Sequence, residues 1–147
     1  MAIIIRQARR AELGRIVGLF VEDQADAILE ALNMDVYEVA FDAMEAERDN
    51  LLIVGEENGR IVACYQLACL SGLVDHGARR ALVAGLRVAA DRAGQGIEAR
   101  MLEDAKSRAR ALRCRLIEIA EMPETAADLL DGLGFTASGT TYRQRLD

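Results

Sequence analysis

A glycine-containing loop, RAGQGIEA at residues 92–99, constrains the fold more than any other part of the sequence. It follows residues 80–88, which are rich in leucine, valine and alanine and predict a buried strand. After the loop, apolar residues such as Ile97 and Met101 recur at helical spacing to about Leu112. A strand, a glycine loop and a helix in this order bring unpaired backbone amides and the positive end of a helix dipole to one point. The segment therefore predicts an anion-binding loop within an α/β fold.

Two common phosphate-binding motifs do not match this loop. The dinucleotide motif G-x-G-x-x-G fails because Ala99 stands where its third glycine would be, and no Walker GK[ST] sequence follows. Glu98 lies in the first helical turn, and two interpretations of it remain open. Its charge would repel a bound phosphate, and its carboxylate could itself occupy the anion site. Alternatively, it points to solvent, stabilises the helix N-terminus and leaves the amides free.

The remaining apolar residues predict a mixed sheet with helices on its faces. Further strands are expected at residues 3–5, 51–54, 61–70, 116–120 and 140–146. Further helices are expected from the apolar stripes at Leu13, Ile16, Val17 and Phe20; at Ala25, Ile28, Leu29 and Leu32; at Val36, Val39, Ala40, Ala43 and Met44; and at Ala126, Leu129, Leu130 and Leu133. Asn33 is expected to end the second of these helices and Asp35 to begin the third. The turn Asn58-Gly59 predicts a hairpin. The order of elements predicts an α/β or α+β architecture in a single domain over residues 1–147.

Composition argues against several classes of function. The formal net charge is −6, whereas nucleic-acid binding draws on basic patches. Tryptophan is absent and aromatic residues make up only 4%, so a platform for stacking bases is not expected. No apolar run is long enough for a membrane span or a signal peptide, which predicts a cytoplasmic protein. Cys64, Cys69 and Cys114 are interpreted as buried free thiols, and no metal site is expected.

Taken with its context, the glycine loop resembles a known family. Residues 81–120, ALVAGLRVAADRAGQGIEARMLEDAKSRARALRCRLIEIA, resemble the acetyl-CoA-binding core of the GNAT acyltransferase superfamily. Leu86-Arg87-Val88 stands at the expected strand end, Gly94-Gln95-Gly96-Ile97 matches the loop, and GLGF at residues 132–135 is similar to a late family segment. The resemblance implies a mostly antiparallel sheet with a central parallel pair and flanking helices.

The resemblance also implies an activity and a cosubstrate. It implies an N-acetyltransferase that moves acetyl from acetyl-CoA to a primary amine of a small molecule by direct attack. In such a protein the backbone of Leu86, Arg87 and Val88 would face the pantetheine arm and the thioester. The CoA phosphates would be held at Ala93, Gly94, Gln95, Gly96, Ile97 and Glu98. Because the family often pairs through its late strands, a homodimer is compatible with the resemblance.

Several positions that usually carry chemistry in the family hold other residues here. The glutamate used as a base falls at Ala84, and the tyrosine that protonates the leaving thiolate falls at Leu130. Two replacement bases are considered, Glu118 and His76. Glu118 is alternatively an ion-pair partner of Arg87 or Arg115, and His76 a solvated loop residue. These departures leave open a second function, a degenerate GNAT domain that acts as a CoA-binding or protein-interaction module.

Overall fold

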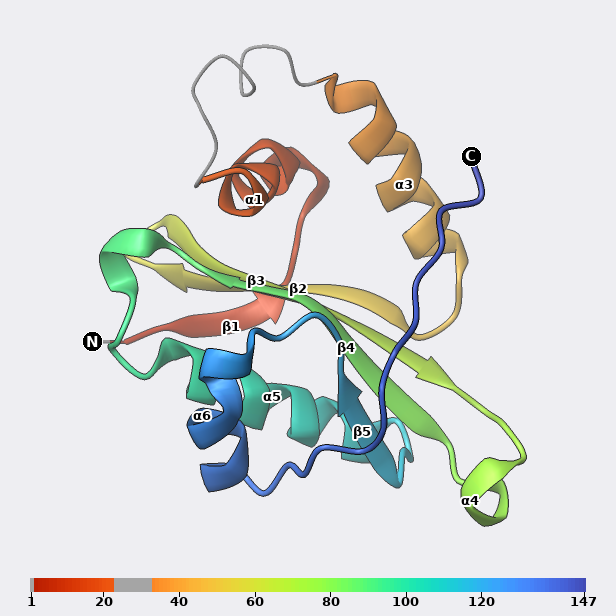
Figure 1. Cartoon of the computed structure of the whole chain (residues 1–147). Helices are drawn as coiled ribbons and strands as arrows, with labels where there is room; N and C mark the ends of the chain where they lie inside the picture. Colours follow the sequence, from red (N-terminus) through yellow and green to blue (C-terminus); the bar gives the residue numbers. More distant parts are fainter. Residues whose placement is uncertain (1, 23–32) are drawn as a thin grey trace.

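The computed structural model describes residues 2–22 and 33–147, which form a five-stranded sheet with helices on both faces (Figure 1). The strand order follows the sequence: β1 (Ile4–Gln7), β2 (Asn50–Glu57), β3 (Arg60–Leu70), β4 (Arg80–Val88) and β5 (Leu116–Ile119). The first three neighbouring pairs are antiparallel, and β4 and β5 are parallel. This mixed sheet confirms the predicted fold class.

Two layers of helices cover the sheet. On one face lie α1 (Leu13–Phe20) and α3 (Met34–Ala46), and on the other lie α5 (Ile97–Ala111) and α6 (Ala127–Gly132) (Figure 1). Single turns lie at η1 (Arg10–Glu12), α4 (Val74–Gly77), η2 (Ala90–Arg92) and η3 (Glu124–Ala126). The helix predicted from Ala25, Ile28, Leu29 and Leu32 lies outside the described residues. No described helix has both the length and the apolar character needed to cross a membrane.

The core lies on both faces of the sheet, against α5 and against α1, and β3 is buried along most of its length. Tyr65 on β3 is fully buried, and its hydroxyl donates to a carboxylate oxygen of Asp104 on α5 at 2.6 Å. Arg108, one turn further along α5, donates to the same oxygen at 2.7 Å. The pair of Asp104 and Arg108 therefore ties α5 to the sheet as well as to itself.

The β2–β3 hairpin forms as predicted. Asn58 and Gly59 both have positive φ angles, 50° and 79°, as a type I′ turn requires. Helix α3 begins at Met34, one residue before the predicted Asp35, and the Asn33 side chain caps it by accepting from the amide of Asp35. Asparagine suits this position because its oxygen satisfies an amide that the helix leaves unpaired.

Most of the apolar stripe predicted for α3 is exposed, and Met44 alone of its residues packs. Val36 and Val39 are 58% and 69% exposed, whereas Phe41 is buried at 5%. The packed stripe consists of Met34, Tyr37, Phe41 and Met44, of which all but Phe41 are half-buried. The helix carries two apolar stripes, and the one with aromatic and long side chains packs because it removes more surface from water.

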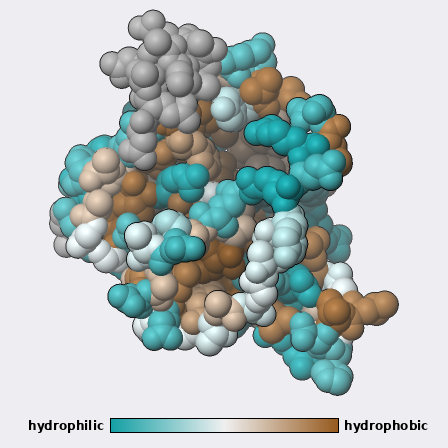
Figure 2. Space-filling view, viewed as in Figure 1, coloured by the Kyte–Doolittle hydropathy of each residue, from teal (hydrophilic) through white to brown (hydrophobic). Residues whose placement is uncertain are grey.

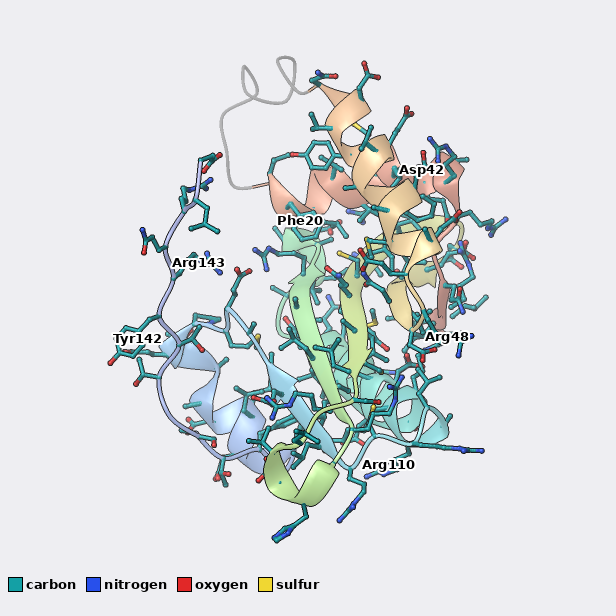
Figure 3. All side chains as sticks on the ribbon, turned by 90° about the vertical axis from the view of Figure 1, so that its right-hand side faces the viewer. Phe20, Asp42, Arg48, Arg110, Tyr142 and Arg143 are labelled. Carbon is teal, nitrogen blue, oxygen red and sulfur yellow. The ribbon has the colours of Figure 1, made fainter. Side chains whose placement is uncertain are left out.

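The strand predicted at residues 140–146 is absent. Residues 136–147 are all exposed, and the segment runs as an extended trace along the outside of the molecule without ladder pairing to any described strand (Figure 3). Tyr142 and Leu146 are 91% and 95% exposed. The segment contains few apolar residues, so pairing it with a strand would bury little apolar surface. That burial would not offset the conformational entropy lost when the segment is ordered.

Candidate functional site

The parallel pair of strands opens where the predicted site begins. Pairing between β4 and β5 runs from Arg80 opposite Leu116 to Val83 opposite Ile119, and a last bond joins the Ala120 amide to the Val83 carbonyl at 2.9 Å. Beyond Val83, residues 84–88 of β4 pair with β3 alone among the described strands. The result is an edge of backbone, open on the β5 side, that leads toward the glycine loop.

A bulge in β4 accompanies this opening. The register with β3 shifts between Cys64 and Gln66, and Gly85 adopts a φ of 62°. A β-carbon at Gly85 would lie 3.1 Å from the Phe20 ring of α1, so glycine is needed for conformation and for space. The bulge lets α1 approach the strand at the residues where β5 has left it.

The glycine loop presents a row of free backbone amides. Gly94 and Gly96 have φ angles of 75° and 78°, and a β-carbon at either would meet no atom within 4 Å. Within the described part of the chain, the amides of residues 94–99 donate to no protein acceptor. These amides stand at the N-terminus of α5, where the helix dipole adds a partial positive charge. Close approach, free donors and positive potential together make an anion site.

Glu98 does not block this loop. Its side chain is half-buried, and among the described residues its carboxylate forms no hydrogen bond with the loop amides and no ion pair. The hypothesis that this carboxylate occupies the anion site is therefore wrong for this structure. Glu98 remains in the first turn of α5, close enough in sequence to repel a bound anion.

The Leu86 carbonyl at the strand end already has a partner. It accepts from Nη1 of Arg87 at 2.9 Å, and the Arg87 guanidinium lies 5.3 Å from the centre of the Phe20 ring. Figure 3 shows Phe20 on α1 above the end of β4. Burial raises the pKa of the Cys64 thiol to about 12 although the nearby Arg87 charge lowers it, so the thiol stays protonated. The Arg87 side chain therefore lies between the end of β4 and the Phe20 ring of α1.

Glu118 is a surface residue in this structure and not a buried base. Its carboxylate pairs with Arg80 at 3.0 Å, and its side chain is 53% exposed. An ion-pair role was expected with Arg87 or Arg115, but the partner is Arg80, because Glu118 lies opposite Leu82 and beside the start of β4. A carboxylate that is exposed to water and already paired with an arginine does not have the enclosed surroundings expected of a buried base.

His76 lies far from the glycine loop. It belongs to α4, which precedes β4, whereas the loop follows β4, so the strand of nine residues separates them by roughly 26 Å. His76 is exposed, and α4 projects from the body of the molecule with the exposed side chains of Leu73 and Val74 (Figures 1 and 2). The structure does not bring His76 and Glu118 together with the loop.

Side-chain amides lie beside Ala84, the strand position at which the family usually carries its base. Ala84 lies opposite Gln66 of β3, and Gln66 donates from Nε2 to Oδ1 of Asn50 at 2.8 Å. Sequence analysis did not single out Gln66 or Asn50, although Gln66 is the one polar residue in the apolar run CYQLACL. Amides can orient an amine or a water molecule, but they do not accept a proton at neutral pH. Leu130, at the position of the family tyrosine, is half-buried on α6.

The fold and the loop form an α/β domain in which a strand opens onto a helix N-terminus with free backbone amides. The model of the acetyltransferase (GNAT) family matches residues 20–135, which is most of the chain. The chain therefore belongs to the GNAT acetyltransferases, and it is an acyl-CoA N-acyltransferase. No curated protein sequence gave a significant match.

Solved structures resemble this chain over its whole length. A transcriptional regulator from Bacillus halodurans is 26% identical, with a TM-score of 0.86 over 99% of this chain and 100% of its own. Glucosamine-6-phosphate N-acetyltransferase from Arabidopsis thaliana is 12% identical, with a TM-score of 0.83 over 100% of both chains. An aminoglycoside N-acetyltransferase in complex with CoA is 14% identical, with a TM-score of 0.78 over 98% of this chain and 94% of its own. The last two share the fold.

Proposed function

We propose that this protein transfers the acetyl group of acetyl-CoA to a primary amine of a small molecule. The observation that carries the proposal is the row of free amides at residues 94–99, reached along the open edge of β4. Two structural neighbours act on aminoglycosides or on glucosamine 6-phosphate by name, which supports a small acceptor. The net charge of −6 is compatible with a cationic amine.

The free loop amides and the open edge of β4 are the features that would receive acetyl-CoA. The amides of residues 94–99 would hold the pyrophosphate, since Gly94 and Gly96 leave open space for it. Residues 84–88 of β4 would offer backbone to the pantetheine arm in place of the departed β5. Acetyl-CoA supplies an activated thioester, so the acceptor nitrogen can attack directly and no residue of the chain needs to become acetylated.

The acceptor must lose a proton, and this sets the expected pH dependence. An alkylamine has a pKa of about 10, so at pH 7 about one molecule in a thousand is neutral. With Ala84 in place of a glutamate and amides beside it, the enzyme draws on the amine that is already neutral. The rate at low acceptor concentration should therefore rise about tenfold per pH unit up to the pKa of the amine.

The first experiment is calorimetric titration with acetyl-CoA at low and moderate salt. We expect micromolar binding by the wild type and tighter binding by Glu98→Gln, with a smaller difference at higher salt because the charge is screened. Glu103→Gln is the matched control, because Glu103 lies on the same helix with its side chain 57% exposed. Equal affinities of Glu98→Gln and the wild type at low salt would show that Glu98 does not disturb the site.

Thiol release with a library of amines then separates catalysis from binding. The alternative function, a CoA-binding or protein-interaction module, is favoured by Ala84 and Leu130 at the usual catalytic positions. The name of the Bacillus halodurans neighbour, a transcriptional regulator, points the same way. Binding of acetyl-CoA without thiol release by any amine across pH 7–10 would support the module. Release that rises with pH supports the transferase.

A further inference from the structure

Two crossed ion pairs join the β2–β3 hairpin to the start of the glycine loop. Glu57 of the hairpin accepts from Arg92 at 2.7 Å and 3.0 Å, through the Nη2 and Nε atoms of the guanidinium. Arg60 of the hairpin donates to both carboxylate oxygens of Asp91 at 2.7 Å and 2.9 Å. We call these four residues the hairpin–loop clamp. Each side of the clamp contributes one positive and one negative residue, so the two segments fit in one register only.

Glu57 is buried in a way that the hairpin itself does not require. Its side chain is 4% exposed, and it is the one charged residue among the buried residues of the described chain. Its Oε2 atom is buried and has no hydrogen-bond partner there. A carboxylate removed from water is costly unless it is paired, so its stability depends on Arg92. The turn needs only Asn58 and Gly59, and the burial of Glu57 needs another reason.

Arg92 could serve the site in two ways that the contacts distinguish. An arginine directly before a phosphate loop would ordinarily be a candidate ligand for the phosphates. Here Nε and Nη2 are occupied by Glu57, and Nη1 donates to the Asp91 carbonyl at 3.3 Å. Turning Arg92 toward a ligand would leave the Glu57 carboxylate buried without a counter-ion. The geometry therefore keeps Arg92 on Glu57 and away from the phosphates.

We infer that Glu57 is a positioning residue of the acetyl-CoA site, which acts by holding Arg92 and thereby the glycine loop. The inference rests on the proposed function for the identity of the ligand. The clamp fixes residues 91 and 92 on one side of the loop, and the buried Ile97 fixes the other side. Only residues 93–96 lie between, and two of them are glycines, which lose the most freedom when ordered. Anchoring both ends reduces that cost before the ligand arrives.

The test is a double-mutant cycle with Glu57→Gln, Arg92→Gln and the double variant. We expect each single change to weaken acetyl-CoA binding about tenfold and to speed hydrogen exchange of the hydrogen-bonded amides that flank the loop, those of residues 92, 93 and 100. The double variant should bind no more weakly than either single variant, because both changes release the same clamp. Tighter or unchanged binding by Glu57→Gln, together with a reduced salt dependence in Arg92→Gln, would make Arg92 a phosphate ligand and overturn the inference.

The exposed ion pair of the clamp, Asp91 with Arg60, provides a second test if Glu57→Gln does not fold. Asp91→Asn breaks the ion pair with Arg60. The side chain of Asp91 is 55% exposed and that of Arg60 is 49% exposed, so the change leaves no buried charge without a partner. It should weaken binding by a smaller factor, about threefold, with faster exchange of the same amides. Arg10→Gln is the control, since it breaks an exposed pair with Asp42 on α3. Equal exchange of these amides in Asp91→Asn and the control would overturn the inference.

Hydrogen exchange also separates this inference from the proposed function. If the wild type does not bind acetyl-CoA, the proposed function fails, but exchange in the unliganded protein still reports on the clamp. Faster exchange confined to the hydrogen-bonded amides of residues 92, 93 and 100 in the folded Glu57→Gln protein would then support the clamp. Unchanged exchange there would overturn it. Urea denaturation of each variant checks that the proteins compared are folded.

Discussion

The part of the molecule that carries the glycine loop is built differently from the part that follows it. Strands β2, β3 and β4 with helix α5 contain most of the buried core, whereas no residue beyond Ala109 is buried. We call the first the sheet core and residues 113–147 the C-terminal part. Free amides can bind an anion strongly only if their positions are fixed beforehand, which the sheet core provides. The C-terminal part packs too little to hold backbone groups in fixed positions.

The largest difference should appear when the same side chain is shortened in both parts. Leu102 on α5 is fully buried, and Leu130 on α6 is half-buried. Leu102→Ala should lower the free energy of unfolding by about 2–5 kcal/mol through lost contacts and a cavity. Leu130→Ala should lower it by about 1 kcal/mol, because less surface returns to water. Urea denaturation followed by far-ultraviolet circular dichroism measures both, since the chain has no tryptophan to report.

Similar losses in the two variants would remove the distinction between the parts. A control with Leu146→Ala, whose side chain is 95% exposed, should change the free energy of unfolding by less than about 0.5 kcal/mol. A large loss for Leu130→Ala alone would mean that α6 packs against the sheet more tightly in solution than in this structure.

A smaller effect is expected from acid at the β1 edge of the sheet. Glu12 accepts from Arg6 at 2.6 Å, and this hydrogen bond lowers the pKa of Glu12 from 4.5 to about 2. Because the folded pKa lies below the unfolded one, the stabilisation is complete above pH 4.5 and is lost as the pH falls toward 2. Its size is on the order of 1 kcal/mol after solvent screening.

Unfolding free energies measured from pH 6 to pH 2 test this dependence. Glu12→Gln should flatten the decline below pH 4.5, because it removes the group that titrates. Glu103→Gln, which breaks an exposed pair with Lys106, should leave the decline unchanged. An equally steep decline in Glu12→Gln would assign the acid sensitivity to other carboxylates.

The sheet core could be predicted from sequence because its signals are local. The bounds of β4, residues 80–88, and the Asn58-Gly59 turn each follow from a short pattern whose physical cause lies within it. The loop also follows, since glycines before a helical stripe need no distant partner to be recognised. The place of the candidate site in the fold, between β4 and α5, could thus be predicted from the sequence.

The features that sequence analysis missed depend on partners far apart along the chain. Glu57 and Arg92 are separated by 35 positions, and nothing near either residue indicates that the other is its counter-ion. The partner of Glu118 is set by the parallel register that brings Arg80 beside it. On α3 both apolar stripes have helical spacing, so the choice between them comes from what the sheet offers to cover.

The smallest effect is expected from removing the end of the chain. A variant that lacks residues 137–147 keeps Phe135, over whose ring Lys106 lies at 5.0 Å, and loses only exposed residues. Among the described residues the removed segment forms one ion pair, that of Arg143 with Glu121, and because its side chains are 71% and 43% exposed it contributes little. The free energy of unfolding should therefore change by less than about 0.5 kcal/mol.

Sedimentation velocity at two concentrations completes the test. A loss of stability together with a change from dimer to monomer would show that residues 140–146 pair as a strand with a second copy, at the edge that β5 leaves open.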